Sequence, residues 1–324
     1  MNKSLICYVC GKTNVGKSSL INALVNNKVS IISDKPDTTR RKVMIGYEDK
    51  EGQILFVDSP GINNRKDYLS EILTQISLDS IKGNDLIYYL VDAPRNKTDQ
   101  VLLDYLKDEK IPIFLIINKI DQMKTQDIDK IILSYKDYLN FAEYIPVSSK
   151  VKTNLDILIT KTFQYSGASM QLFEKGFISS MDKEQMITEF VREKIYYFTQ
   201  AEIPYSTDVL ITHKDKNTYY LSIICEKDSQ KKILLGKNGT IIKKIRLQAK
   251  KDIKRYLKMD LNLDLFIKVQ KEWKNKLDNS EVRCQWDPDR DIYGNPIGRR
   301  AIQLGIKGET VRKYVNEWIV NITD

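Results

Sequence analysis

The sequence predicts an α/β domain with a mostly parallel sheet, followed by a smaller α+β domain. Two observations predict this division. The chain has 324 residues, about twice the usual size of one domain. Apolar, β-rich runs alternate with segments of helical period up to about residue 165, and a different order of elements begins after Asp182. We place the first domain at 1–168, a linker at 169–182, the second domain at 183–275 and a C-terminal extension at 276–324.

Five apolar runs in the first domain are typical of strands: Leu5–Cys10, Gln53–Val57, Leu86–Val91, Ile113–Ile117 and Tyr144–Val147. Between them, apolar residues recur at helical spacing, for example over 101–106 and 131–139. Alternating strands and helices predict a mostly parallel sheet covered on both faces.

The second domain has a different order of elements. The pattern loosens into a linker from Ser166 to Asp182, and a helix follows over 187–198. Two strands, a short helix, a longer helix and a last strand come next, at Tyr205–Thr212, Tyr219–Cys225, Lys231–Leu235, Ile242–Tyr256 and Leu263–Val269. We expect the polar residues His213–Thr218 to form the turn between the two strands.

Charge differs between the two halves of the chain. Up to Met170 there are 23 Lys and Arg against 21 Asp and Glu, and after it 29 against 22. The stretch Lys227–Lys258 holds twelve basic residues and two acidic ones. This asymmetry suggests a polyanion as partner of the second half, although a solvated helix face has the same pattern.

Cysteine use and hydropathy indicate a reducing, aqueous location. The four cysteines, at positions 7, 10, 225 and 284, are too few and scattered for a disulfide framework. Cys7 and Cys10 share an expected strand, where odd spacing points them to opposite faces, which disfavours a zinc site. No run reaches the roughly 18 residues that span a bilayer and no signal peptide is apparent, so we expect a cytoplasmic protein.

A phosphate-binding loop is predicted between the first strand and the next helical segment. The residues fit G-x-x-x-x-G-K-[ST] and are Gly11, Lys12, Thr13, Asn14, Val15, Gly16, Lys17 and Ser18. Backbone N–H groups of such a loop cradle phosphates at a helix N-terminus. We expect Lys17 to reach the β- and γ-phosphates and Ser18 to bind Mg²⁺.

A second motif follows the strand at 53–57 and consists of Asp58, Ser59, Pro60 and Gly61, with Ile62 after it. Asp58 lies at the carboxyl end of its strand, where α/β sheets bind ligands, and we expect it to hold Mg²⁺ through water. Gly61 lacks a Cβ, so its N–H can approach a γ-phosphate.

Base recognition is expected from the motifs after the last two strands of the first domain. Asn118, Lys119, Ile120 and Asp121 form N-K-x-D, and Ser148, Ser149 and Lys150 form the later loop. The carboxylate of Asp121 can accept from both N1–H and the exocyclic amine of guanine, whereas adenine presents an acceptor at N1. These motifs therefore favour GTP over ATP.

The chain resembles the Era family of GTPases over roughly residues 3–275. The resemblance rests on Asn14–Ser18, Thr38–Arg40, the D-x-P-G at Asp58, the N-K-x-D at Asn118 and Glu202–Ser206. It implies a P-loop GTPase domain followed by a type II KH domain. It also implies Asp37–Arg41 as the first switch loop, in which we choose Thr39 over Thr38 as the residue that closes on Mg²⁺.

The resemblance further implies cofactors and partners. GTP and GDP with Mg²⁺ are the expected ligands, and a K⁺ ion at Asn14 is expected because related GTPases with an aliphatic residue at the position of Ile62 use one there. The expected partners are small-subunit ribosomal RNA near its 3′ end and the small ribosomal subunit, whose assembly and rRNA maturation the protein would assist. A monomer with a peripheral contact to the cytoplasmic membrane face is also implied.

Hydrolysis is expected to depend on Lys17, Thr39 and Gly61. Ile62 stands where many switch GTPases carry a water-orienting Gln, and an aliphatic side chain cannot hydrogen-bond the attacking water. We therefore expect slow intrinsic turnover. An RNA-binding module with a structural, non-hydrolysed GTP is the alternative, and a tRNA-modification GTPase is a third reading that the second domain argues against.

An RNA site is predicted at the tetrapeptide Gly236, Lys237, Asn238 and Gly239, between two helices in the most basic stretch. The α-β-β-α-α-β order around it matches a type II KH domain, in which this loop clamps about four nucleotides beside an apolar groove. Candidate groove residues are Ile233, Ile241, Lys243 and Arg246.

The extension continues past the usual end of the family. Apolar residues recur at helical spacing near its end, at Val311, Tyr314, Val315, Trp318 and Ile322, and predict an amphipathic helix. Packing against the KH domain and a contact with the ribosome or a membrane surface are the two interpretations.

Overall fold

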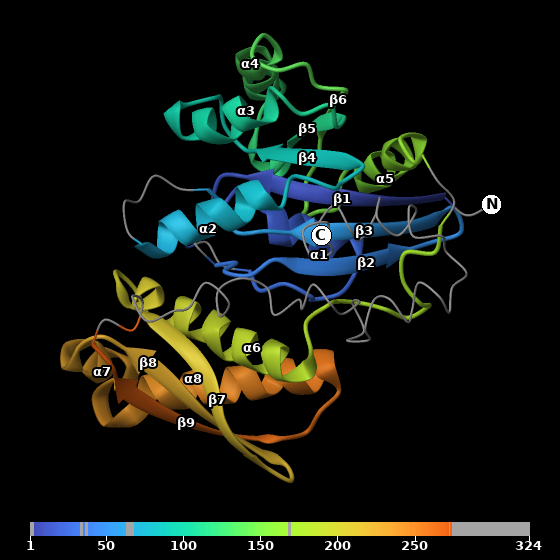
Figure 1. The fold of residues 1–324 in the computed structure, drawn as a ribbon. Coiled ribbons are helices and arrows are strands. Elements are labelled where there is room, and N and C mark those ends of the chain that lie inside the picture. Colours follow the sequence, from blue (N-terminus) through green and yellow to red (C-terminus); the bar gives the residue numbers. More distant parts are fainter. Residues whose placement is uncertain are drawn as a thin grey trace, which may run out of the picture. The chain divides into compact units, whose positions relative to one another are not determined.

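The structure is a computed structural model that describes residues 3–32, 35, 38–62, 68–167, 170–271 and 273 (Figure 1). The chain divides into two compact units, and each is described by itself. Among the described residues, no helix combines the length and the apolar character that crossing a membrane requires. The extension predicted at 276–324 lies outside the described residues.

The first unit is built on a six-stranded sheet of order β2-β3-β1-β4-β5-β6. Its strands are β1 (Lys3–Gly11), β2 (Val43–Glu48), β3 (Gly52–Asp58), β4 (Leu86–Val91), β5 (Ile113–Ile117) and β6 (Glu143–Pro146). Only β2 runs antiparallel to its neighbour, so the prediction of a mostly parallel sheet is confirmed. The carboxyl ends of the parallel strands consequently meet at one edge.

Helices cover both faces of this sheet. They are α1 (Lys17–Leu24), α2 (Tyr68–Asp79), α3 (Gln100–Leu106), α4 (Thr125–Lys136) and α5 (Leu155–Gln164), with 3₁₀ turns η1 (Lys97–Asp99) and η2 (Ile120–Gln122). Leu103 of α3 and Ile131 of α4 share a core with Cys10, while Tyr88 bonds Thr162 of α5. Both Cys7 and Cys10 are buried free thiols in β1.

Strand β2 was not predicted, because its polar end and the internal Gly46 break the apolar run. Its free edge is covered by part of the expected linker: Gly46 N–H donates to the Ile178 carbonyl (3.1 Å) and Ser180 N–H to the Met44 carbonyl (2.8 Å). Residues 178–180 therefore lie along β2 and protect an edge that would otherwise expose unpaired backbone groups.

The second unit contains α6 (Lys183–Phe198), η3 (Ile203–Tyr205), β7 (Thr207–Asp215), β8 (Thr218–Cys225), α7 (Asp228–Leu235), η4 (Lys237–Gly239), α8 (Thr240–Asp252) and β9 (Asn262–Val269). A π-helical turn, η5 (Ile253–Leu257), extends α8. The sheet order is β7-β8-β9, with β7 antiparallel and β9 parallel to β8. This is the α-β-β-α-α-β order expected of a type II KH domain.

The turn predicted at His213–Thr218 is shorter in the structure, where it consists of Lys216 and Asn217. His213, Lys214 and Asp215 continue β7 and pair with β8, so only Lys216 and Asn217 connect the strands. His213, Lys214 and Asp215 are all exposed, so no apolar alternation marks the end of β7. A register shift between Ile211 and His213 adds to the irregular pattern.

The close approach of β1 and β3 at Gly52 gives a stability prediction. A Cβ at residue 52 would lie 1.9 Å from the Lys3 carbonyl oxygen, so the strands would have to separate. We expect Gly52→Ala to destabilise the protein by about 1–3 kcal/mol. The control is Gly167→Ala, whose added Cβ meets nothing within 4 Å; thermal unfolding of both variants checks this, and equal melting temperatures would contradict it.

Candidate functional site

The predicted phosphate loop connects β1 to α1. Gly16 has φ +97°, a left-handed conformation that favours glycine, and α1 begins at the next residue, Lys17. The Lys17 ammonium is buried and donates to the carbonyls of Gly11 (3.1 Å) and Lys12 (2.8 Å). The side chain is thus already folded over its own loop, where a phosphate could take over these hydrogen bonds.

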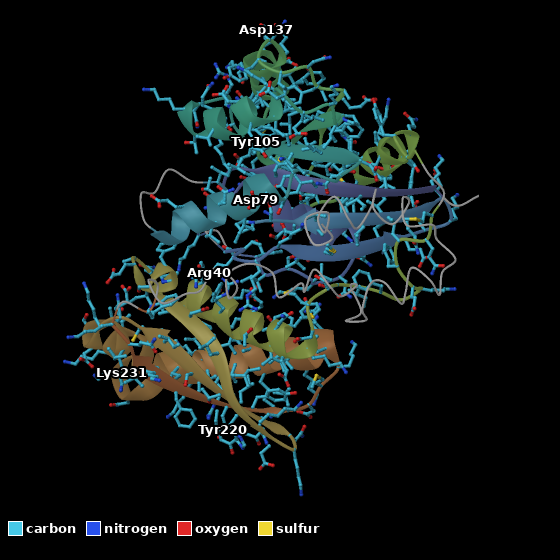
Figure 2. All side chains as sticks on the ribbon, viewed as in Figure 1. Arg40, Asp79, Tyr105, Asp137, Tyr220 and Lys231 are labelled. Carbon is cyan, nitrogen blue, oxygen red and sulfur yellow. The ribbon has the colours of Figure 1, made fainter. Side chains whose placement is uncertain are left out.

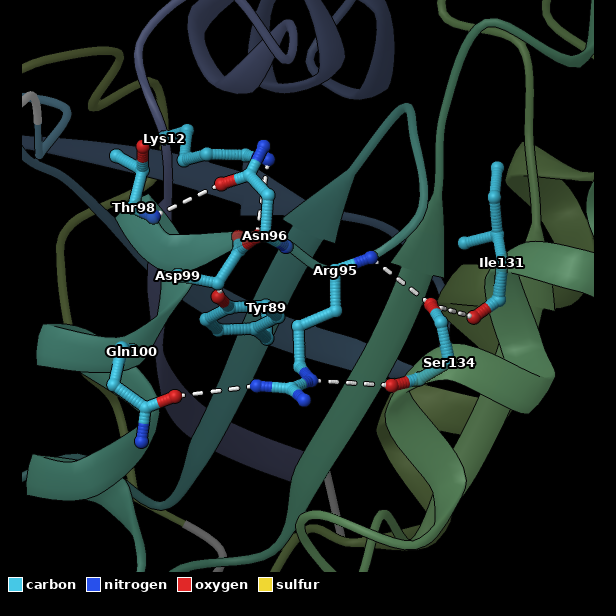
Figure 3. A network of polar contacts seen from close by, with 9 residues as sticks. All are labelled: Lys12, Tyr89, Arg95, Asn96, Thr98, Asp99, Gln100, Ile131 and Ser134. Carbon is cyan, nitrogen blue, oxygen red and sulfur yellow. Dashed lines mark hydrogen bonds and ion pairs between the residues drawn. The ribbon is translucent and has the colours of Figure 1, made fainter.

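Lys12 is held by a polar network that no motif indicated (Figure 3). Its ammonium lies 3.1 Å from the buried carboxylate of Asp99, which also accepts from Tyr89 Oη (3.1 Å) and Asn96 N–H (2.8 Å). Burial, followed by the Asp99 charge, raises the pKa of Tyr89 well above its ordinary value. The network ties the phosphate loop to the segment after β4, and a sequence offers no signal for it beyond a polar loop.

Three oxygen-bearing side chains converge next to the loop. The Ser18 hydroxyl donates to Asp58 Oδ2 (3.0 Å) and lies 3.0 Å from the Thr39 hydroxyl. Asp58 is fully buried, and its Oδ1 has no hydrogen-bonding partner in the described part of the chain. Burial raises the pKa of Asp58, and the Lys17 ammonium opposes that rise. An unpaired buried carboxylate oxygen beside two hydroxyls fits a hard cation such as Mg²⁺.

The segment after β3 packs closely under the phosphate loop. A Cβ at Gly61 would lie 2.7 Å from Lys17 Nζ and 2.9 Å from Thr13 Cα, so only glycine fits without a shift. The Ser59 hydroxyl lies 2.8 Å from Tyr8 Oη in the core, beside Pro60. Ile62 is buried in the apolar core, and its carbonyl accepts from Thr13 N–H (3.2 Å). The side chain of Ile62 therefore serves packing.

Asn118 links the phosphate loop to the loop after β6. Its side-chain amide donates to the Val15 carbonyl (2.9 Å), and its oxygen accepts from the N–H (3.1 Å) and hydroxyl (2.9 Å) of Ser149. The neighbouring Lys119 donates to the Asn14 carbonyl (2.6 Å) and pairs with Asp92 (2.7 Å). Three loops that are far apart in the sequence are thereby held together.

Asp121 lies exposed at the end of this cluster. It accepts from the buried Ser148 hydroxyl (2.6 Å), and this hydrogen bond lowers the pKa of the Asp121 carboxyl. Ile120 packs against the core, and Lys150 is exposed on the later loop. Asp121 is consequently ionised at neutral pH and accessible to a base.

The predicted RNA loop joins α7 to α8. Gly236 and Gly239 have φ of +69° and +73°, and Lys237 and Asn238 between them are exposed. A Cβ at residue 236 would lie 2.7 Å from Ile241 Cγ1, so the loop lies directly on that side chain. The four candidate groove residues differ in burial. Ile241 packs on the core, whereas Ile233, Lys243 and Arg246 are exposed.

Comparison with known proteins covers both units. A family profile described as a 50S ribosome-binding GTPase matches residues 6–119, and a profile of a domain of unknown function matches residues 237–324. GTPase Era of Heliobacterium modesticaldum is 36% identical over 277 residues, which are 83% of this chain and 93% of that protein. GTPase Era of Clostridium kluyveri is 34% identical over 85% of this chain and 96% of its own length.

The chain belongs to the Era family of GTPases. Two solved Era structures agree with this, each with 30% identity and a TM-score of 0.80. One is Era with MgGDPNP and nucleotides 1506–1542 of 16S ribosomal RNA. The matched region spans 87% of this chain and 98% of the Era chain. The other is Aquifex aeolicus Era bound to GDP·AlF4⁻. The matched region spans 86% of this chain and 98% of that Era chain.

The buried carboxylate of Asp58 gives a pH-dependent prediction. Because burial raises its pKa in the folded state, ionising it costs stability as pH rises through that pKa. We expect Asp58→Asn to raise the melting temperature of the nucleotide-free protein at pH 7, and the gain to vanish below the ordinary carboxyl pKa near ~3.9. The same variant should weaken Mg²⁺ binding in the nucleotide complex about 10- to 100-fold.

The matched control is Asp129→Asn, which removes an exposed carboxylate on α4. Melting curves at several pH values and Mg²⁺ titrations check both expectations. A melting temperature of Asp58→Asn that equals that of the unmodified protein at every pH would contradict the role of burial.

Proposed function

We propose that this chain is a GTP-binding and GTP-hydrolysing switch that binds small-subunit ribosomal RNA near its 3′ end and assists assembly of the 30S-type subunit and rRNA maturation. The observation that carries the proposal is the combination of the described nucleotide loops with a KH unit in one chain. The same combination occurs in the Era that was crystallised with both MgGDPNP and 16S ribosomal RNA.

In this proposal the phosphates bind at the loop 11–18. Lys17 exchanges its bonds to the loop carbonyls for bonds to the β- and γ-phosphates, and the backbone N–H groups at the start of α1 complete the cradle. Ser18, Thr39 and Asp58 would hold Mg²⁺, which neutralises charge on the phosphate oxygens when bound. A Cβ at Gly61 would lie 2.7 Å from Lys17 Nζ, so its backbone passes close to the ammonium, and its N–H would reach the γ-phosphate there.

Hydrolysis in this site proceeds without a side chain that orients water at residue 62, since Ile62 is buried. Positioning by Lys17, Thr39 and Gly61 therefore carries the reaction, and turnover is slow.

Potassium at Asn14, in the phosphate loop, would add positive charge beside the β- and γ-phosphates. We expect faster phosphate release in KCl than in NaCl at equal ionic strength, and a loss of this difference in Asn14→Ala. Equal rates in both salts would remove K⁺ from the proposal.

Guanine recognition rests on Asp121, whose carboxylate is oriented by Ser148. An Asn at this position would place an amide donor against the donors of guanine, and would instead suit xanthine, which carries a carbonyl in place of the exocyclic amine. We expect Asp121→Asn to weaken GTP binding by at least about 10³-fold and to gain binding of xanthosine triphosphate. Competition between the two nucleotides measures both changes, and undiminished GTP binding would contradict the assignment.

RNA binding is assigned to the KH unit. Lys237 and Asn238 project from the loop between α7 and α8, and the exposed Lys243 and Arg246 follow on α8. The side chain of Arg246 lies 3.8 Å from Asp264, a loose pair that a phosphate could replace. Such a surface suits single-stranded RNA, whose backbone the loop clamps while its bases enter the groove.

The experiment that tests the whole proposal combines RNA identification with turnover. The protein is crosslinked to total RNA in the presence of a non-hydrolysable GTP analogue, and the bound fragments are sequenced. We expect the 3′ end of small-subunit rRNA to be enriched, and Lys237→Glu to reduce that enrichment. Enrichment of other RNAs alone would overturn the assignment of the partner.

Multiple-turnover phosphate release separates the switch from an RNA-binding module with a structural GTP. Release of many equivalents of phosphate per protein supports the switch, and Lys17→Ala should abolish it. Release of one equivalent or none would favour the structural nucleotide.

We assign the protein to the cytoplasm, together with the small subunit, and cell fractionation tests this location. Flotation with vesicles tests the peripheral membrane contact that the family resemblance implies.

A further inference from the structure

Asp99 is a buried carboxylate that belongs to none of the nucleotide motifs. Its side chain is only 1% exposed and lies in the short turn η1 after β4. Its Oδ1 accepts from Tyr89 Oη (3.1 Å), and its Oδ2 accepts from Asn96 N–H (2.8 Å) (Figure 3). Both donors lie outside the phosphate loop, because Tyr89 is fully buried in β4 and Asn96 caps the turn. The carboxylate is therefore anchored to the core of the first unit.

Lys12 reaches this carboxylate from the phosphate loop. Its ammonium donates to Asp99 Oδ2 (3.1 Å), and only 14% of its side chain is exposed. An ammonium that is largely withdrawn from water needs such a partner, since an unpaired buried charge is costly. The pair thus fixes the direction of the Lys12 side chain.

The main chain of Lys12 is in turn connected to the rest of the site. Its carbonyl accepts from the Lys17 ammonium (2.8 Å), and Lys12 forms an isolated bridge with Ile62. The next residue, Thr13, donates its N–H to the Ile62 carbonyl (3.2 Å). A displacement of Lys12 would therefore move an acceptor of Lys17 and disturb the contact with the segment that follows Gly61.

The segment between β4 and α3 holds the phosphate loop at a second point. Asp92, which directly follows β4, lies 2.7 Å from the Lys119 ammonium, and that ammonium also donates to the Asn14 carbonyl (2.6 Å). Two carboxylates of one segment thus act on the loop through two lysines. Lys119 belongs to the N-K-x-D motif, whereas Lys12 occupies an unspecified position of the phosphate-loop motif.

We propose that Asp99 is a positioning residue for the nucleotide and that it acts through Lys12 to hold the phosphate loop in the shape that binds phosphates. The inference rests on the GTP binding proposed above and adds to it a residue outside the loop. It assigns Lys12 to the shape of the loop and not to a direct bond with phosphate.

The two roles of Lys12 differ in the sign of the effect that loss of Asp99 would have. A lysine that bound phosphate directly would be released by this loss, and nucleotide binding would tighten. A lysine that shapes the loop would lose its anchor, and binding would weaken.

Nucleotide binding by the full chain tests the proposal. We expect Asp99→Asn and Lys12→Met each to weaken binding of GTP and GDP roughly tenfold. The double variant should bind no more weakly than the worse single variant, because both changes remove the same pair. Lys12→Arg, which keeps the cation, should bind nucleotide more tightly than Lys12→Met.

Steady-state hydrolysis distinguishes positioning from a loss of folded protein. The KM for GTP should rise in Asp99→Asn by about the same factor as the dissociation constant, while kcat stays within about twofold. A smaller folded fraction would instead lower kcat and leave KM unchanged. The matched control is Asp104→Asn, which breaks the exposed pair of Asp104 with Lys107 (3.1 Å) at the end of α3 and should change neither constant.

Hydrogen exchange measured without nucleotide gives a readout that does not depend on activity. The Thr13 amide, which donates to the Ile62 carbonyl, should exchange faster in Asp99→Asn than in the unmodified protein. Amides of Leu115 and Ile116 in β5 should keep their protection and report an intact sheet.

Three results would overturn the proposal. Nucleotide binding could be unchanged or tighter in Asp99→Asn, kcat could fall while KM stays the same, or the Thr13 amide could exchange at the same rate in both proteins. If the unmodified protein failed to bind GTP, the function proposed above would fall, whereas the exchange result would still decide whether Asp99 holds the loop.

Discussion

The proposed nucleotide site is organised around one buried carboxylate, that of Asp58. Asp58 ends a central strand, has one oxygen bonded by Ser18, and leaves the other without a partner in the described part of the chain. Removing a charge from water is expensive unless it is paired. The neighbouring Lys17 ammonium offsets part of this cost, and a bound divalent cation would offset more. The apolar core around β3 thus holds a carboxylate whose burial cost would fall when a divalent cation binds beside it.

Much of this arrangement could be predicted from the sequence because the relevant signals are local. The motifs at 11–18, 58–61 and 118–121 each follow an apolar run, and parallel strands bring the ends of such runs to one edge of the sheet. The order of elements in the KH unit was also recoverable, because the helices of its core show regular apolar spacing. The roles of the individual site residues remain proposals, although the structure brings the nucleotide group together.

What escaped prediction has no local signal. The ion pair of Lys12 with Asp99 joins residues 87 positions apart, and only the fold brings them into contact. Strand β2 pairs with the adjacent β3 on one side, but on the other side it is stabilised by residues 178–180, which are remote in sequence. The end of β7 was predicted as part of a turn because His213, Lys214 and Asp215 are all exposed and so show no alternation of apolar and polar residues. In each case tertiary contacts outweigh local propensity.

The side chain of Asn118 has a kinetic implication for nucleotide exchange. Its hydrogen bonds to Val15 in the phosphate loop and to Ser149 in the loop after β6 link these two loops to each other. If the nucleotide binds along these loops as proposed, loosening either loop would strain the Asn118 side chain that both share. Release of the diphosphate would then require both loops to open together, and a factor that accelerates it would need to act on only one of them.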